Sequence, residues 1–193
     1  LNHTLDAHGF PPYTRAEVRA MVGNGLRRLM ADACPEGTPQ AEVDAVFEDF
    51  CAYYADHCND HTRPYAGVVA MVGRLRAAGV RCAVVSNKGD FAVCELMDLH
   101  FPGVFDFVLG QRDDIPRKPD PDMVYAAMAA LEADQSNSVY VGDSEVDVAT
   151  AANAGIPCLS VTWGFRDPEW LSAHGATELV DSVGGLGDAI LAG

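Results

Sequence analysis

Residues 138–155 read SVYVGDSEVDVATAANAG, and in this stretch a strand-like apolar pattern is followed directly by a helical one. The first residues, Ser138 to Val141, form a short apolar run that predicts a buried strand. Glu145 to Ala154 then has the spacing of a helix, which the next glycine ends at the usual C-terminal position. Asp143 lies at the tip of the strand, and Asp147 follows one helical turn later. A strand that passes directly into a helix is typical of an α/β protein.

The same alternation extends outward from this stretch over residues 63–193. We predict strands at Val80–Ser86, Phe105–Leu109, Pro157–Thr162 and Glu178–Val180, and helices at Val68–Ala78, Asp90–Leu99, Pro121–Ala133 and the C-terminus. Strands that are apolar on both faces and separated by helices indicate a parallel, doubly wound sheet. Ligands of such sheets bind beyond the carboxyl ends of the strands.

Residues 1–62 predict helices only. Thr14-Arg15-Ala16-Glu17 is a capping box, and apolar residues at three- and four-residue spacing follow it as far as Met30, which predicts one helix. A second helix opens at Pro39. Asn59 to Pro64 is polar and turn-like, so we expect a hinge there between a helical unit and the α/β unit.

Surface charge limits the partners that this protein can bind. The 193 residues include 28 acidic and 13 basic side chains, for a formal net charge of -15. Such a surface repels nucleic acid and anionic lipid, so we expect neither as a partner. No apolar run reaches the length of a membrane span, and the six cysteines show no paired spacing, so we expect a reduced, cytoplasmic protein. Nothing in the sequence indicates an oligomeric state.

Two of the predicted strand ends carry groups that could bind an anion. Ser86 and Asn87 end the strand that begins at Val80, and their hydroxyl and amide can donate hydrogen bonds to phosphate oxygens. Lys118 lies in the run Arg117-Lys118-Pro119-Asp120-Pro121, where two prolines restrict the backbone and suit a lysine that must point in a fixed direction. Taken alone, the first motif is also a common start of a helix, and the second is also an ordinary basic loop.

A third strand end brings two carboxylates close together, those of Asp143 and Asp147. Like charges about 4 Å apart cost roughly 4 kcal/mol at an effective dielectric constant of 20. A bound Mg²⁺ would relieve that cost and would supply the positive field that an acidic protein lacks. The structural alternative is that Asp143 caps the helix and Asp147 is solvated.

Together and in this order, the three motifs resemble motifs two, three and four of the haloacid dehalogenase-like (HAD) superfamily. The resemblance covers essentially the whole chain. It implies a Rossmann-like core at 63–193 and an α-helical cap at 1–62, with the end of the preceding core helix at 1–9. Three further segments look most like the phosphoglycolate phosphatase branch, namely Val22-Gly23-Asn24-Gly25, Thr62–Gly67 and Val161–Arg166.

The resemblance implies Mg²⁺-dependent hydrolysis of a small phosphorylated metabolite through an aspartyl-phosphate, with 2-phosphoglycolate as the leading candidate. By position in the motifs, Ser86 would bind the transferring phosphoryl group, and Asn87 would assist through its backbone amide or side chain. Lys118 would balance the negative charge of the nucleophile and the phosphate. Asp143 would hold Mg²⁺, and Asp147 would support the metal site without binding the ion directly.

One part of the family pattern is absent from these 193 residues, the Asp-x-Asp-Gly-Thr motif whose first aspartate is the nucleophile. Thr4-Leu5-Asp6 echoes only its tail. The strand that carries this motif would be central in the sheet, and without it two apolar strand edges would be unpaired. We therefore expect a longer polypeptide whose N-terminal segment supplies the nucleophile. A chain that truly began at Leu1 would have no phosphatase turnover and would bind phosphate at best.

Other functions remain open at this point. The substrate of a phosphatase could be pyrophosphate, a nucleotide or a sugar phosphate, because the cap selects it. A phosphoglucomutase-type isomerase and a non-catalytic anion-binding protein are further alternatives, whereas the Asp143–Asp147 pair disfavours a dehalogenase. His57 and His61 have the spacing of a zinc pair, but we expect structural histidines. Arg166 could contact a substrate carboxylate.

Overall fold

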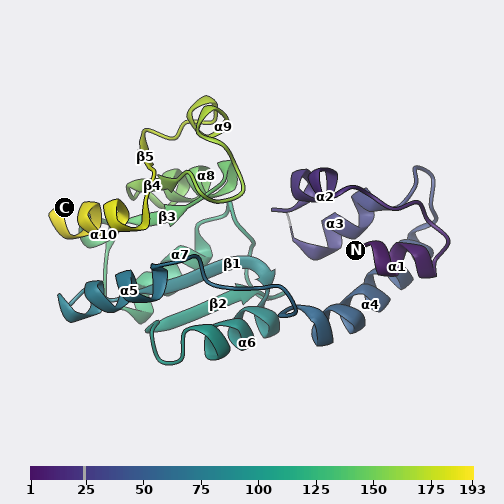
Figure 1. Ribbon diagram of the computed structural model, residues 1–193, viewed down its shortest axis with the longest axis horizontal. Helices are drawn as coiled ribbons and strands as arrows, with labels where there is room; N and C mark the ends of the chain where they lie inside the picture. Colours follow the sequence, from purple (N-terminus) through teal and green to yellow (C-terminus); the bar gives the residue numbers. More distant parts are fainter. Residues whose placement is uncertain (24) are drawn as a thin grey trace. The chain divides into compact units, whose positions relative to one another are not determined.

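A computed structural model describes residues 1–23 and 25–193, so Asn24 of the Val22–Gly25 motif lies outside the described residues. The chain divides into two compact units, Leu1–Thr62 and Arg63–Gly193 (Figure 1). The roles of cap and core stay predictions for these two units. In the described part of the chain, every helix is too short or too polar to span a membrane.

The first unit contains four helices: α1 (Asn2–Ala7), α2 (Arg15–Met21), α3 (Leu26–Ala33) and α4 (Gln40–His57). The long helix α4 packs against α1 and α3. Its apolar face and theirs form one core, whose buried side chains include Leu5, Leu29, Met30, Ala33, Val43, Val46 and Phe50.

The predicted helix from Arg15 to Met30 is two helices, so that prediction is wrong. The helical conformation is interrupted between Met21 and Leu26, where Gly23 and Gly25 have φ angles of +133° and +84°. Positive φ is incompatible with a right-handed helix, and only glycine adopts it without strain. The apolar spacing continues across the break, which is why periodicity alone did not reveal it.

The second unit alternates helices and strands, and the predicted α/β class is confirmed. In chain order its elements are α5 (Val68–Ala77), β1 (Ala83–Gly89), α6 (Asp90–His100), β2 (Phe107–Gln111), α7 (Asp122–Ala130), a 3₁₀ turn (Gln135–Asn137), β3 (Tyr140–Gly142), α8 (Glu145–Ala154), β4 (Cys158–Val161), α9 (Pro168–Ala173), β5 (Glu178–Val180) and α10 (Val183–Ala192). The short helix α9 was not predicted. Its signals are Asp167, which caps it, and Pro168 at its first position.

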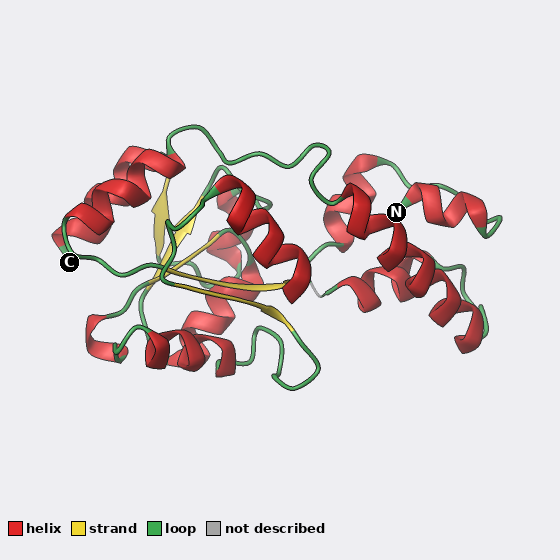
Figure 2. Ribbon diagram, turned by 90° about the horizontal axis from the view of Figure 1, so that it is seen from below, coloured by secondary structure: helices red, strands yellow, loops and turns green. Residues whose placement is uncertain are grey.

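All strand pairs are parallel, and the strands form two sheets (Figure 2). One sheet pairs β1 with β2, and the other has the order β3-β4-β5. Helices α6 and α7 pack against the first sheet, and α8 packs against β3 and β4. Within the described residues, β1 and β3 each pair along one edge only, and Val141 of β3 is 39% exposed. An unpaired strand edge leaves backbone donors and acceptors available to a further strand, and the presence of such a strand stays a prediction.

Candidate active site

Lys118 and Asp147 meet at the carboxyl ends of the strands. Lys118 lies on the loop between β2 and α7, and Asp147 lies in the first turn of α8. The Lys118 Nζ donates to Asp147 Oδ1 at 2.8 Å and to the Tyr140 hydroxyl at 3.0 Å. The two charged side chains are 11% and 9% exposed, so the ion pair is largely shielded from solvent. A shielded pair with good geometry holds both partners in one orientation.

The carboxylate of Asp147 is fully occupied by hydrogen-bond donors. Oδ1 accepts from Lys118 and from the Tyr140 hydroxyl at 3.1 Å, and Oδ2 accepts from the Ser144 hydroxyl at 2.7 Å and the Asp143 amide at 3.1 Å. Burial opposes ionisation of this group, but Lys118 and the other donors outweigh it and hold the pKa below its ordinary value. Asp147 therefore holds Lys118 in place, and its supporting position near a metal stays a prediction.

Sequence reasoning missed Tyr140. Its hydroxyl joins the Lys118–Asp147 pair, and its pKa is raised, first by burial and then by the negative charge of Asp147. The hydroxyl therefore stays protonated and can donate. A tyrosine inside an apolar strand is itself a signal, because a buried hydroxyl requires a polar partner.

Asn87 binds the backbone of Lys118 through both ends of its amide. Its Nδ2 donates to the Lys118 carbonyl at 3.0 Å, and its Oδ1 accepts from the Lys118 amide at 2.9 Å. Asn87 is buried, with 8% exposure. The side chain of Asn87 thus connects β1 to the loop that carries the lysine.

The strand β1 has the predicted length of seven residues but lies three residues further along the chain, at Ala83–Gly89 and not at Val80–Ser86. It continues past Ser86 to Gly89, with an irregular register between Val85 and Gly89. Ser86 therefore lies within the irregular end of the strand and not at the start of a helix, and its hydroxyl accepts from the Lys88 amide at 3.1 Å. Asn87, which contacts Lys118, lies within this irregular segment.

Asp143 is a half-buried carboxylate at the end of β3. Its Oδ2 accepts from the Phe165 amide at 3.0 Å. Burial raises its pKa, and the nearby charge of Asp147 adds to that effect, while the Phe165 bond opposes it. This environment disfavours the negative charge of Asp143, so a bound cation would fit there.

Mg²⁺ suits the donors at this position. No group of three His, Cys, Asp or Glu side chains gathers as a metal site in residues 1–23 and 25–193. Mg²⁺ in phosphate-handling enzymes is held by only one or two carboxylates, together with water and the phosphate of the substrate. Asp143 can be such a ligand.

Arg166 is engaged by a carboxylate of the protein itself. Its Nε and one terminal nitrogen donate to the two oxygens of Glu145 at 2.7 and 2.8 Å. The hydrogen bonds from Arg166 lower the pKa of Glu145 to about 2. The suggestion that Arg166 contacts a substrate carboxylate therefore loses its main support, because the guanidinium is already paired.

Of the two histidines with zinc-like spacing, His57 contacts an aspartate and an aromatic ring of its own unit. The Nδ1 of His57 lies 2.7 Å from a carboxylate oxygen of Asp60, and its ring stacks on Tyr53 with 4.1 Å between centroids.

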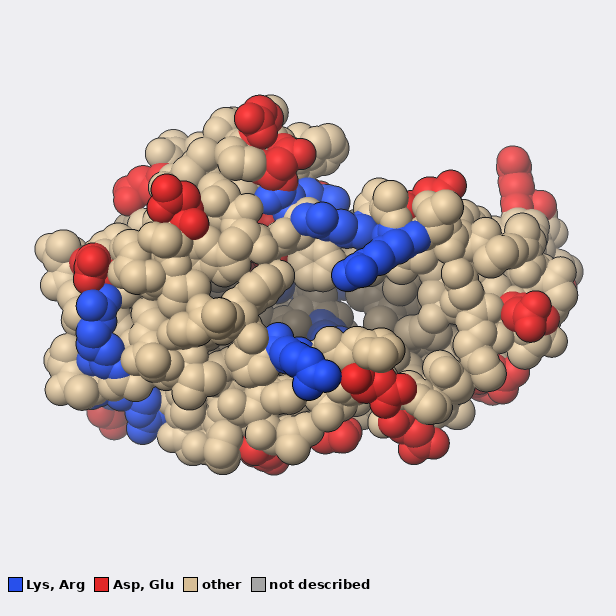
Figure 3. All heavy atoms as spheres, in the orientation of Figure 1, with Lys and Arg blue, Asp and Glu red and all other residues tan. Residues whose placement is uncertain are grey.

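Acidic side chains lie scattered over the faces of both units that Figure 3 shows, in keeping with the net charge.

Parallel strands with a shielded lysine–carboxylate pair and a half-buried carboxylate at their carboxyl ends suit a hydrolase that acts on phosphate esters. The family model for haloacid dehalogenase-like hydrolases matches residues 1–161, and the chain belongs to this family. It is a phosphatase of the phosphoglycolate phosphatase-like branch, as the motifs predicted.

Three similar proteins illustrate the relationship. A phosphoglycolate phosphatase of Agrobacterium fabrum is 30% identical over 86% of this chain and 73% of its own length. An N-acetylmuramic acid 6-phosphate phosphatase of Pseudomonas aeruginosa is 32% identical over 91% of this chain and 78% of its own length. A solved structure of a candidate phosphoglycolate phosphatase from Lactobacillus delbrueckii subsp. bulgaricus is 36% identical, with a TM-score of 0.92 over 98% of this chain and 88% of that chain.

Proposed function

We propose that the protein hydrolyses 2-phosphoglycolate in a Mg²⁺-dependent reaction through an aspartyl-phosphate. The observation that carries this proposal is the shielded Lys118–Asp147 pair beside Asp143 at the strand ends. Phosphoryl transfer needs positioning and charge neutralisation more than covalent chemistry from the protein, and a fixed cation supplies both. The relative from Agrobacterium fabrum supports the substrate.

The residues of this chain divide the work between them. Lys118 neutralises charge on the phosphate and the nucleophile, and Asp147, Tyr140 and Asn87 hold it in place. The Ser86 hydroxyl binds a phosphoryl oxygen. Asp143 would hold Mg²⁺, which would supply positive charge to the transferring group when it is bound.

We further propose that an aspartate outside these residues is the nucleophile, on a strand that pairs with the open edges of β1 and β3. The acidic surface and the absence of paired cysteine spacing favour a cytoplasmic enzyme that acts on a small metabolite. A sugar phosphate is the second candidate substrate, because the relative from Pseudomonas aeruginosa acts, by its name, on N-acetylmuramic acid 6-phosphate.

A substrate screen tests the proposal on a polypeptide that includes the nucleophile segment. We expect phosphate release from 2-phosphoglycolate with a higher kcat/KM than from N-acetylmuramic acid 6-phosphate, pyrophosphate, nucleotides or glucose phosphates, and only when Mg²⁺ is present. Faster release from the sugar phosphate would favour the second candidate. Interconversion of glucose phosphates without release would indicate an isomerase, and phosphate binding without any turnover would indicate an anion-binding protein.

Substitution of the lysine tests the site itself. Lys118→Met should lower kcat by at least about 100-fold, because it removes the fixed positive charge and leaves Asp147 without its cation. Arg74→Met is the matched control, since Arg74 forms an exposed ion pair with Asp188 on the surface of the second unit. Near wild-type kcat in Lys118→Met would refute the role of the lysine.

A further inference from the structure

The loop after β4, residues 162–167, folds closely over Asp143. Two successive backbone amides of this loop bond to the one aspartate: Phe165 donates to Asp143 Oδ2 at 3.0 Å, and Arg166 donates to the Asp143 carbonyl at 3.2 Å. Gly164 approaches so closely that a Cβ atom there would overlap the Asp143 carboxyl group. The position of this loop therefore decides where the carboxylate of Asp143 points.

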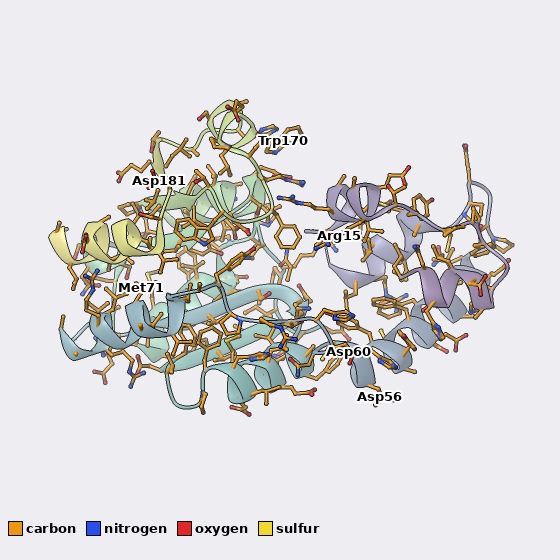
Figure 4. All side chains as sticks on the ribbon, in the orientation of Figure 1. Arg15, Asp56, Asp60, Met71, Trp170 and Asp181 are labelled. Atoms are coloured by element: carbon orange, nitrogen blue, oxygen red, sulfur yellow. The ribbon has the colours of Figure 1, made fainter. Side chains whose placement is uncertain are left out.

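The same loop is tied to the start of α8 by Glu145. Arg166 donates to both oxygens of Glu145 in a two-pronged arrangement, and the indole Nε1 of Trp170 donates to one of them at 3.0 Å. Trp170 lies on α9 (Figure 4), and its amide donates to the Asp167 side chain that caps this helix. Glu145 thus receives two hydrogen bonds from the 162–167 loop, which covers Asp143, and one from α9, which follows it.

These contacts are suited to fixing a loop. A guanidinium that meets a carboxylate through two parallel bonds is held in orientation as well as in distance, and charge assistance makes such bonds stronger than neutral ones. The side chains of Arg166 and Glu145 are 18% and 26% exposed, so solvent screens this pair less than the exposed pairs elsewhere on the molecule. Glu145 is two residues from Asp143 in the chain, so both ends of the contact lie next to the site.

We propose that Arg166 and Glu145 are positioning residues that hold the 162–167 loop against Asp143, and so set the orientation of its carboxylate for Mg²⁺. This inference rests on the proposed function, in which Asp143 is the metal ligand. Neither Arg166 nor Glu145 needs to touch the metal or the substrate. Partners of a metal ligand commonly change metal affinity by 10- to 100-fold when they are removed.

The experiment compares Arg166→Gln, Glu145→Gln and the double variant in the polypeptide that includes the nucleophile segment. Calorimetric titration of Mg²⁺ without substrate should show affinity weakened about tenfold in each single variant. The double variant should be no weaker than about the worse single one, because both substitutions remove the same contact. Arg166→Lys, which keeps the charge and one bond, should recover part of the affinity.

Two further measurements separate positioning from other roles. At saturating Mg²⁺ the KM for substrate should stay within about twofold of wild type in Arg166→Gln, and exchange of the Phe165 amide with solvent should become faster. The control is Arg74→Gln, which breaks the exposed pair with Asp188 and should leave Mg²⁺ affinity, KM and Phe165 exchange unchanged. A raised KM with unchanged Mg²⁺ affinity would overturn the inference and make Arg166 a substrate ligand.

A parallel titration of Asp143→Asn separates the role of Asp143 as a metal ligand from the positioning role of Arg166 and Glu145. Unchanged Mg²⁺ affinity in Asp143→Asn would refute the metal ligand of the proposed function. Weakened Mg²⁺ affinity in Asp143→Asn together with wild-type Mg²⁺ affinity in a folded Arg166→Gln would refute only the positioning role of Arg166 and Glu145. Thermal unfolding of each variant shows whether it is folded, and Arg166→Lys serves as the folded variant if Arg166→Gln is not.

Discussion

At the scale of single residues, the site depends on how completely Lys118 is held. Its ammonium group is bound by Asp147 and Tyr140. Its backbone amide and carbonyl are both hydrogen-bonded to the side-chain amide of Asn87. The motif Ser86-Asn87 and the lysine were recognisable in the sequence because their residue types and their order are informative. That Asn87 serves the lysine was not recognisable, because 31 residues separate them.

Removal of one hydroxyl tests this network. Tyr140→Phe keeps the ring and deletes the group that contacts both Lys118 and Asp147, so we expect a loss of about 1–2 kcal/mol in the free energy of unfolding. We also expect a several-fold decrease in kcat, because the lysine gains freedom. Urea unfolding and steady-state kinetics measure the two effects.

Tyr125→Phe is the matched control for that substitution. Tyr125 is 40% exposed, and its hydroxyl makes a long bond of 3.3 Å to the Asn153 carbonyl. We expect its effect to stay within about 0.5 kcal/mol. Equal effects of the two substitutions would contradict a special role for Tyr140.

At the scale of elements, the junction between β3 and α8 requires a glycine. A Cβ atom at Gly142 would overlap the Asp147 side chain. We expect Gly142→Ala to destabilise the protein by about 1–3 kcal/mol and to lower kcat, because Asp147 must move away from Lys118. Gly184→Ala in α10 is the control, since no atom lies within 4 Å of its Cβ position, and it should be neutral or stabilising. Tolerance of Gly142→Ala in both assays would contradict the close approach.

The start of α2 is held by a reciprocal cap. The Thr14 hydroxyl accepts from the Glu17 amide at 3.3 Å, and the Glu17 carboxylate accepts from the Thr14 amide at 2.7 Å. We expect Thr14→Ala to cost about 1 kcal/mol in the free energy of unfolding of the first unit. Thr38→Ala is the control, because the Thr38 hydroxyl donates to the Pro35 carbonyl and caps no helix. Circular dichroism during urea unfolding measures both.

This cap also has a predictable pH dependence. Hydrogen bonds from Thr14 hold the pKa of Glu17 below its ordinary value of 4.5. A lowered folded-state pKa means that the stabilisation is present above pH 4.5 and is lost as the pH falls through the folded pKa. An NMR titration should therefore show a Glu17 pKa below 4.5 that rises toward 4.5 in Thr14→Ala. A pKa that is the same in both proteins would contradict the cap.

At the scale of the whole molecule, the two sheets of the second unit are open where β1 and β3 lack a neighbour within the described residues. Val141 of β3 is 39% exposed, which is unusual for an apolar side chain on a strand of a doubly wound sheet. We propose that the strand with the nucleophile fills this position. The same strand would complete both the sheet and the site.

Thiol labelling at one position tests this proposal. Val141→Cys should react readily in residues 1–193 alone and should be at least about tenfold slower in the polypeptide that includes the nucleophile segment, because a new strand covers it. Leu179→Cys on the outer strand β5 is the control, with 40% exposure, and should react equally in both. Equal labelling of Val141→Cys in the two polypeptides would contradict the proposed strand.

The sequence by itself determined the alternation of strands and helices, the class of the fold, and the three motifs at the strand ends. Those features are local, because periodicity and residue type act over a few neighbouring positions. Only the tertiary structure decided that Lys118 pairs with Asp147 and Tyr140, and that Glu145 binds Arg166. These partners lie 21 to 29 residues apart, and they meet because parallel strands bring their carboxyl ends to one edge of the fold.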